Sequence, residues 1–388
     1  ERMMARMKTV MFLADGMADE PLLELGGKTP LEVAATPGMD EIAAHGISGT
    51  FLSLPNGLPT SSDVANLSVL GYEPERCYPG RGPLEAAAMG IELGPDDIAW
   101  RCNLVTVSDG VLQDYSAGHI ASARAASLMA ALQAELGDSR VSFHAGVSYR
   151  HLLVLHGREF CERVEYHKPD SSQGQPLAEL RLSPADTTPE AAHTVQFLDE
   201  LAERAVAVLA RHPANHGVGA PANRIWPWSP GRRARLQPFV EKYGCRGAVI
   251  SAVDVIFGIA HCAGMTEIRV PGATGFIDTN YEGKAAAAVR ALADHDFVFV
   301  HVEAIDECGH MGDLALKLRA ITDFDARLVV PVIRELGMSG VTYAVLPDHP
   351  VPVRLRQHTR TPVPVAVCGP HLQPDEVRQY SEALAPSG

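Results

Sequence analysis

Three short apolar runs, each followed closely by a carboxylate, constrain the fold of this sequence most. The runs are Thr9–Ala14, Phe297–Val302 and Val341–Leu346. Their length, their apolar side chains and the polar residues around them are typical of buried strands. Segments with the pattern of helices lie between them, so the sequence predicts an α/β fold with a central, mostly parallel sheet flanked by helices.

Metal-ligating side chains gather at the ends of these runs and shortly after the last one. They are Asp15, Asp306, His310, Asp348, His349 and His358. A single Asp-x-x-x-His pair is more often a solvated surface pair than a ligand pair. The recurrence at three strand ends favours a site, because ligands bind at the carboxyl ends of strands in open α/β sheets. Three Asp and three His are sufficient for two divalent metal ions a few ångströms apart.

A serine follows the Pro/Gly-rich loop 55–60 at the start of a further helix. Ser61 and Ser62 precede an apolar segment that Gly71 ends. The commoner role of such a serine is to cap the helix. The functional interpretation is that a hydroxyl at this end lies where free N–H groups hold a phosphate. The two roles are compatible, and both stay open at this point.

Charge and cysteine usage restrict the partners. The 388 residues carry a net charge of −14, which argues against nucleic acid and anionic membranes as partners. An anionic substrate therefore needs a local cationic pocket. The seven cysteines are scattered singly, which is typical of reduced thiols in a cytoplasmic protein. No apolar run approaches the length of a membrane span, and the sequence makes no prediction of oligomeric state.

The pattern of elements changes near residue 99. A strand, a turn and a return strand occupy about 100–115, a strand pair occupies 141–155, and a long amphipathic helix occupies 187–212, with Thr187 or Thr188 as its cap. We therefore expect an α+β domain at 99–220, inserted into a metal-binding core formed by 1–98 and 221–388. All six candidate ligands and Ser62 lie outside this insertion, which predicts that it covers the site.

The order of these motifs resembles one known family. Asp15 is followed by Ser62-Asp63-Val64, Asp306-x-x-x-His310, Asp348-His349 and His358-Thr359. This pattern resembles the cofactor-independent phosphoglycerate mutases of the alkaline phosphatase superfamily, and among them the shorter archaeal-type branch. The resemblance covers nearly the whole chain, and it implies an alkaline-phosphatase-like core with a smaller inserted domain.

The resemblance implies roles for the seven residues. Asp306, His310 and His358 would bind one metal ion, and the other ion would be bound by Asp15, Ser62, Asp348 and His349. Ser62 would be the nucleophile that carries the phosphoryl group between 3-phosphoglycerate and 2-phosphoglycerate, without 2,3-bisphosphoglycerate. Coordination by a metal ion is one way to activate a serine hydroxyl. The ligand types favour Mn²⁺ or Zn²⁺, and Co²⁺ or Mg²⁺ are also compatible.

The resemblance also implies residues that bind the anionic substrate. The candidates are His119, Arg150, Lys284, Arg81 and Arg232. The Arg150 guanidinium suits bidentate binding of a carboxylate or phosphate. The segment that contains Arg232 departs from the Gly-rich run expected of the branch, so no exact role carries over there. The insertion would exclude water, because water would hydrolyse a phosphoserine.

Three alternatives remain. The same site could serve another phosphomutase or a phosphomonoester hydrolase of the superfamily. A homoserine-kinase-like phosphotransferase is a further alternative, but no nucleotide-binding motif supports it: Gly283-Lys284 is followed by Ala285 where a P-loop has Ser or Thr. A non-catalytic metal-binding protein would require that Ser62 is only a helix cap.

Overall fold

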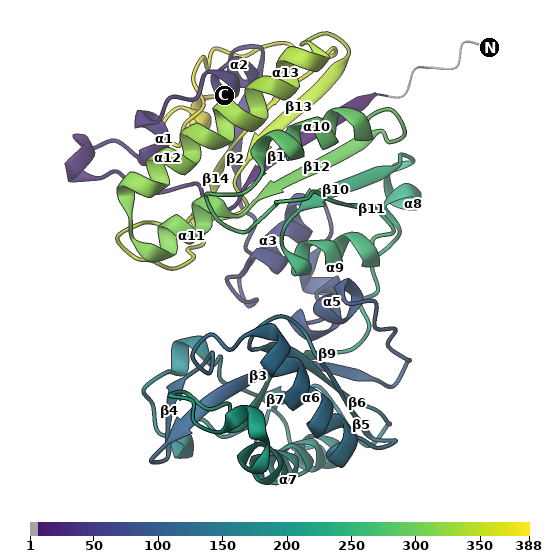
Figure 1. Cartoon of the computed structure of the whole chain (residues 1–388). Coiled ribbons are helices and arrows are strands. Elements are labelled where there is room, and N and C mark those ends of the chain that lie inside the picture. Colours follow the sequence, from purple (N-terminus) through teal and green to yellow (C-terminus); the bar gives the residue numbers. More distant parts are fainter. Residues whose placement is uncertain (1–6) are drawn as a thin grey trace. The chain divides into compact units, whose positions relative to one another are not determined.

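The computed structural model describes residues 7–388, which form two compact units. The core unit consists of the chain up to Tyr78 together with Leu236–Gly388, and the insert unit is Pro79–Arg235. The sequence colours of Figure 1 show that the insert unit is one continuous stretch of chain. It extends beyond the expected 99–220 at both ends, because the flanking segments α5 (Arg81–Ala88) and β9 (Arg224–Gly231) contact strand β3 (Ile98–Ser108).

The core unit is built on a seven-stranded mixed sheet in the order β11-β10-β12-β1-β13-β14-β2. The five strands from β11 to β13 run parallel, and the pairs β13–β14 and β14–β2 are antiparallel. The bounds are β1 Lys8–Ala14, β2 Gly46–Phe51, β10 Gly247–Ser251, β11 Thr266–Arg269, β12 Phe297–Val302, β13 Val341–Leu346 and β14 Val363–Cys368. The three predicted apolar runs are thus confirmed as strands, and β1 pairs with both of the others.

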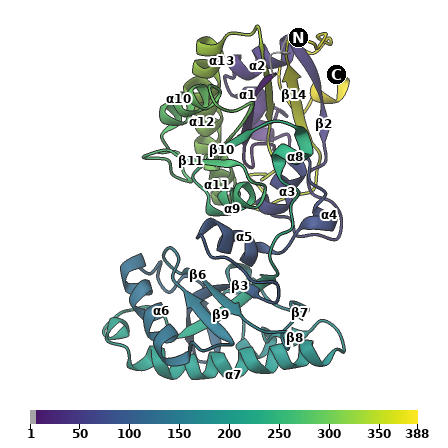
Figure 2. The same ribbon diagram turned by 90° about the vertical axis from the view of Figure 1, so that its right-hand side faces the viewer.

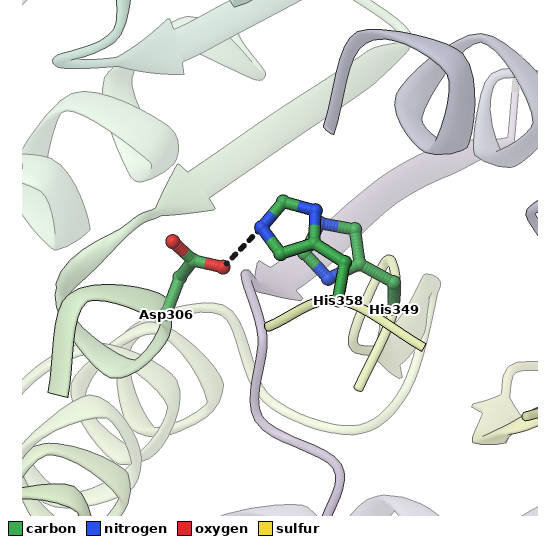
Figure 3. A group of neighbouring side chains, drawn as sticks. All are labelled: Asp306, His349 and His358. Carbon is green, nitrogen blue, oxygen red and sulfur yellow. Dashed lines mark ion pairs between the residues drawn. The ribbon is translucent and has the colours of Figure 1, made fainter. Parts of the chain in front are cut away.

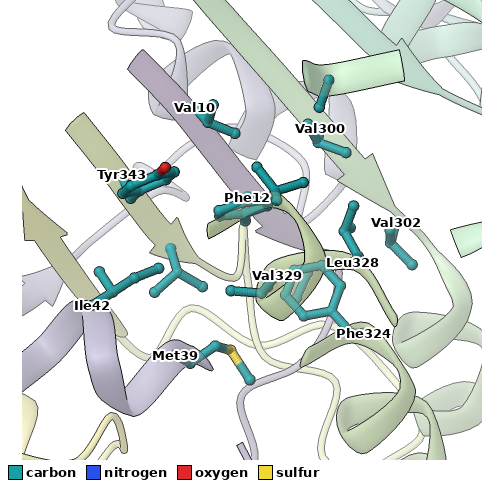
Figure 4. Packing of buried hydrophobic residues seen from close by; sticks show 14 of the residues in the cluster. Val10, Phe12, Met39, Ile42, Val300, Val302, Phe324, Leu328, Val329 and Tyr343 are labelled. Carbon is teal, nitrogen blue, oxygen red and sulfur yellow. The ribbon is translucent and has the colours of Figure 1, made fainter. Parts of the chain in front are cut away.

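Helices flank this sheet. They are α1 Pro30–Val33, α2 Pro37–Ala44, α3 Ser62–Val69, α4 Pro74–Cys77, α8 Phe239–Tyr243, α9 Asp254–Cys262, α10 Tyr281–Ala291, α11 Ala304–Met311, α12 Leu314–Phe324 and α13 Val330–Leu336. Pro37 occupies the first position of α2 and separates this helix from α1. Figure 4 shows the core between sheet and helices, where Phe12 and Val300 face Phe324 and Val329.

The insert unit is built on a five-stranded antiparallel sheet. Its strands are β3, β4 Val111–Asp114, β5 Val141–His144, β6 Arg150–Leu155 and β9, while β7 Val164–Glu165 and β8 Ser183–Pro184 form a separate pair. Two helices, α6 Ser122–Leu136 and α7 Pro189–Arg211, share an apolar core with β3, and Figure 2 shows α7 along this unit. Thr188 caps α7 by accepting from the N–H of Ala191, as predicted. Within residues 7–388 we find no helix long and apolar enough to cross a membrane.

Candidate active site

The strand order of the core unit brings the predicted ligands together. Asp15 follows β1 directly, Asp306 lies in the first turn of α11 after β12, and Asp348 follows β13. Because these three strands are parallel neighbours, their carboxyl ends meet at one edge of the sheet. All three carboxylates are buried there. Burial of three like charges at one edge indicates a cation-binding site.

One group of ligands, called the inner set, consists of Asp15, Asp348 and His349. Their ligating atoms lie within 4.8 Å of one another, and all three side chains are buried. His349 Nε2 lies 3.4 Å from Asp15 Oδ1 and 3.4 Å from Asp348 Oδ2. Ser62 Oγ lies 3.1 Å from the same nitrogen. The structure therefore groups Ser62 with the inner set, as the resemblance implies.

The other group, called the outer set, consists of Asp306, His310 and His358. The two Asp306 oxygens lie 3.3 Å from His310 Nε2 and 3.4 Å from His358 Nε2. His349 joins the two sets, since its ring stacks on His358 with centroids 3.9 Å apart, and Asp306, His349 and His358 also form a group within metal-binding distance. Figure 3 shows these three side chains and the Asp306–His358 ion pair.

The ring orientations in the outer set fit a metal ion. His310 Nδ1 lies 2.9 Å from the carbonyl oxygen of Arg356, and His358 Nδ1 lies 3.0 Å from that of Thr60, so both rings donate through Nδ1. The Nε2 atoms then face each other at 2.9 Å with their lone pairs beside Asp306. A cation must lie between them, either a proton or a metal. Burial lowers the pKa of His310, but Asp306 outweighs it and raises the pKa to about 9.

The inner set fits a metal ion as well. Burial, followed by the charges of Asp348 and Asp306, raises the pKa of Asp15 well above its usual value. Among the described residues, Asp15 Oδ1, Asp306 Oδ1 and His349 Nδ1 are buried atoms that make no hydrogen bond. Buried oxygens without donors are costly, and a divalent cation would satisfy the two carboxylates.

Ser62 is not the cap of its helix. The N-cap of α3 is Ser61, whose side chain makes no capping hydrogen bond, and Ser62 is the first helical residue. Its hydroxyl instead faces His349. Of the two serines expected to cap this helix, Ser61 takes the N-cap position, so capping does not account for Ser62. Because Ser62 is the first residue of α3, its hydroxyl lies at the positive end of the helix dipole.

Two buried polar residues that the sequence analysis missed hold the inner set. Asn66 Nδ2 donates to Asp348 Oδ2 (2.9 Å) and to the carbonyl oxygen of Ser62 (2.8 Å). His301, on β12, lies 3.0 Å from Asp15 Oδ2, and burial lowers its pKa to about 3, so the ring is neutral. The sequence could have indicated Asn66, because it follows Ser62 by one helical turn and so lies on the same face of the helix. For His301 the only indication in the sequence is a polar residue within an apolar strand.

Four candidates for anion binding lie in the insert unit. His119 and Arg150 are both exposed and both contact Tyr149: the His119 ring packs edge-on with centroids 6.0 Å apart, and the guanidinium lies 5.4 Å from the ring centre. The structure thus brings these two together. Arg81 donates to Glu85 (3.0 Å), and Arg232 donates to Glu162 (2.9 Å) and to the carbonyl oxygen of Phe160 (3.1 Å).

Lys284 differs from the expectation. Its side chain lies inside the core unit, 0% exposed, and Nζ donates to the carbonyl oxygen of His301 at 3.0 Å. The structure places this lysine behind β12 as a support of the strand, and we leave it out of the proposed substrate contacts. The motif around Lys284 gave no sign of burial, because a lysine near the start of an alanine-rich helix is usually solvated.

Comparison with known proteins finds relatives over nearly the whole chain. The model of the family described as 2,3-bisphosphoglycerate-independent phosphoglycerate mutase matches residues 43–215. A protein of that name from Methanosarcina barkeri is 48% identical over 93% of this chain and 90% of its own. A relative from Geobacter sulfurreducens, named as a probable enzyme of this kind, is 47% identical over 98% of this chain and 96% of its own.

Two solved structures are similar over nearly the whole chain. The cofactor-independent phosphoglycerate mutase of Thermoplasma acidophilum has a TM-score of 0.66 and 28% identity, covering 98% of this chain and 95% of that one. A protein from Pyrococcus horikoshii has a TM-score of 0.83 and 27% identity, covering 99% and 93%. Together with the full-length relatives, they confirm the resemblance drawn from the motifs: this chain belongs to the family of 2,3-bisphosphoglycerate-independent phosphoglycerate mutases.

Proposed function

We propose that this protein interconverts 3-phosphoglycerate and 2-phosphoglycerate through a phosphoserine at Ser62, with two divalent metal ions held by the inner and outer sets. One observation carries the proposal. The Ser62 hydroxyl lies 3.1 Å from His349 Nε2, and His349 belongs to both groups of potential ligands. A nucleophile beside two cation sites is an arrangement that suits phosphoryl transfer, because two cations can stabilise both the attacking and the leaving oxygen.

The serine performs two transfers in turn. Ser62 loses its proton and Oγ attacks the phosphorus of 3-phosphoglycerate, the bond from phosphorus to the glycerate 3-oxygen breaks, and that oxygen takes up a proton. The bound glycerate then reorients, its 2-hydroxyl loses its proton and attacks the phosphoserine, the bond from phosphorus to Oγ breaks, and Oγ takes up a proton again. Divalent ions, when bound, favour the ionised serine and offset the charge of the phosphoryl oxygens. The free N–H groups at the start of α3, which begins at Ser62, would also stabilise the phosphoryl oxygens.

The roles of the ligands follow from their surroundings. Asp15 would offer Oδ1 to the inner ion while Oδ2 accepts a hydrogen bond from His301. Asp348 would offer Oδ2, which lies beside His349 Nε2 and also accepts from Asn66, while Oδ1 accepts from two backbone N–H groups. The neutral imidazoles of His310 and His358 would offer Nε2 to the outer ion, because Nδ1 of each already donates to a carbonyl. Mixed carboxylate, imidazole and hydroxyl ligation favours Mn²⁺ or Zn²⁺.

We also propose that the insert unit binds the substrate carboxylate. Arg150 and His119 are exposed and adjacent on this unit, around Tyr149. A guanidinium offers two parallel donors to a carboxylate, which a single histidine cannot. Holding the glycerate during its reorientation prevents water from taking the phosphoryl group.

An enolase-coupled assay tests the activity. Metal-stripped protein receives 3-phosphoglycerate without 2,3-bisphosphoglycerate, before and after addition of Mn²⁺ or Zn²⁺, and free phosphate is measured in parallel. The proposal predicts metal-dependent formation of 2-phosphoglycerate with no release of phosphate. Release of phosphate alone would make the protein a hydrolase with the same site. No turnover with either metal ion would contradict the proposed substrate.

A further inference from the structure

We propose that His301 is a positioning residue, which holds one oxygen of Asp15 so that the other is presented to the inner metal ion, and that Ser251 fixes the tautomer of this histidine. The inference deepens the proposed function, because it rests on the inner set being a metal site. It concerns a residue on a neighbouring strand that would touch neither substrate nor metal.

The tautomer follows from the contacts. His301 is 0% exposed, and its Nδ1 lies 3.0 Å from Ser251 Oγ. Nε2 lies 3.0 Å from Asp15 Oδ2 and carries the hydrogen of this contact, since a metal-binding carboxylate only accepts. With the hydrogen on Nε2, Nδ1 is the acceptor for the Ser251 hydroxyl. Ser251 Oγ also accepts from the N–H of Val253 at 3.1 Å, which holds the hydroxyl in place.

The two oxygens of Asp15 therefore have different roles. Oδ2 accepts from His301, whereas Oδ1 is buried, makes no hydrogen bond among the described residues, and lies 3.4 Å from His349 Nε2. Rotation of the carboxylate would cost the bond to His301, so Oδ1 stays directed into the inner set. Outer partners of this kind set the direction and the basicity of a metal ligand.

The ring itself has little freedom. His301 pairs with Leu13 in the β1–β12 ladder, two residues before Asp15, so the two groups face each other across adjacent strands. Lys284 fixes the strand from behind by donating to the His301 carbonyl oxygen at 3.0 Å. The buried lysine therefore supports the strand that carries His301, a role that its sequence motif did not indicate. The sheet fixes the position of the imidazole ring, and Ser251 determines which ring nitrogen carries the hydrogen.

Binding of Mn²⁺ to metal-stripped variants tests the inference without reference to activity. Free Mn²⁺ is measured by electron paramagnetic resonance during a titration of wild type, His301→Leu, His301→Gln and Ser251→Ala. We expect His301→Leu to bind one of its two ions 10- to 100-fold more weakly, which is the range for loss of an outer partner. His301→Gln can donate from its amide in place of Nε2 and should stay within about threefold. Ser251→Ala should lie between these two.

A matched control separates positioning from general damage. His151 is also a buried strand histidine, 1% exposed, but it lies in the insert unit. His151→Leu should change thermal stability while both ions bind as in wild type. If His301→Leu does not fold, Ser251→Ala and His301→Gln still carry the comparison.

The outcomes are distinct. Wild type that binds two ions, together with unchanged binding by His301→Leu and Ser251→Ala, would overturn the inference and leave the proposed function intact. Equal losses in His301→Leu and His301→Gln would also overturn it, because shape rather than donation would then matter. Wild type that binds two ions but fails the enolase-coupled assay would contradict the proposed function alone. Wild type that binds fewer than two ions would overturn both.

Discussion

The inner and outer ligand sets differ in how the fold supports them. Asp348 in the inner set is 0% exposed and accepts from the N–H groups of Gly16 and His349 as well as from Asn66. In the outer set the side chains of His310 and His358 are 36% and 17% exposed, and the anchors that orient each ring through Nδ1 are main-chain carbonyls. The inner set is thus part of the core, whereas the outer set depends on the segment that carries Arg356 and His358. A preformed geometry at the inner set is what a metal-bound nucleophile needs.

The largest expected effect is at the serine that joins the inner set. Ser62→Ala removes the nucleophile, and we expect kcat to fall by at least about 10³-fold. Affinity for the outer ion should stay near that of wild type, since Ser62 contacts His349 and not the outer aspartate. The matched control is Ser61→Ala, because Ser61 is the neighbouring residue and makes no capping bond. Retention of full activity by Ser62→Ala in the coupled assay would contradict the catalytic assignment.

The second prediction concerns the scaffold behind the inner set. Lys317 Nζ is buried and donates to Asp19 Oδ2 (2.8 Å) and to the carbonyl oxygens of Val351 (2.8 Å) and Ala18 (3.4 Å). It therefore ties the segment after Asp15 to the segment after His349. Lys317→Met leaves the Asp19 carboxylate buried without its partner, which should lower the free energy of unfolding by about 3–5 kcal/mol.

The control for Lys317 lies on the same helix. Arg319 is an exposed cation on α12, 3.6 Å from Asp323, and Arg319→Met should change the free energy of unfolding by no more than about 0.5 kcal/mol. Urea unfolding of the metal-stripped proteins measures both. Equal stability of the two variants would show that the buried Lys317–Asp19 pair stabilises the fold no more than an exposed pair does.

The third prediction separates both metal sets from the substrate. Arg150→Ala should lower kcat/KM about 10- to 100-fold, the range for loss of a charged hydrogen-bond partner, while two ions still bind. Arg158 is the control, since it is an exposed arginine of the same unit that pairs with Asp96. Loss of bound metal in Arg150→Ala would show that Arg150 supports the site rather than the substrate.

The residues proposed as ligands could be selected from the sequence because several of them have a local signal. Asp15 and Asp348 directly follow apolar strands, and Asp306 and His310 share a helical face one turn after another strand. Local patterns do not give strand order, however, and the partners that hold these ligands come from across the sheet. His301 lies on the face of β12 opposite Val300, yet nothing near it in sequence indicates that β1 is its neighbour.

The bounds of the insertion could not be predicted for a related reason. The segment 79–98 and the segment 221–235 read as parts of the core in sequence, because neither carries a change of pattern. In the structure β9 pairs with β3 from Ala99 to Val105, and α5 packs on the same strand. Whether a segment belongs to the core unit or to the insert unit depends on which distant segments it pairs with. The hydrophobic periodicity of the sequence does not indicate these pairings.

The smallest effect that we predict tests the contrast between the sets directly. The outer ion should dissociate at least about tenfold faster than the inner ion when a chelator is added, because a ligand that is partly open to water can be replaced stepwise by water, whereas a buried one cannot. Stopped-flow mixing of the two-metal protein with a chromogenic chelator measures both rates. His310→Ala should remove the fast phase and leave the slow one. A single phase in wild type, or loss of the slow phase in His310→Ala, would show that the two sets exchange as one cluster, joined through the stacked rings of His349 and His358.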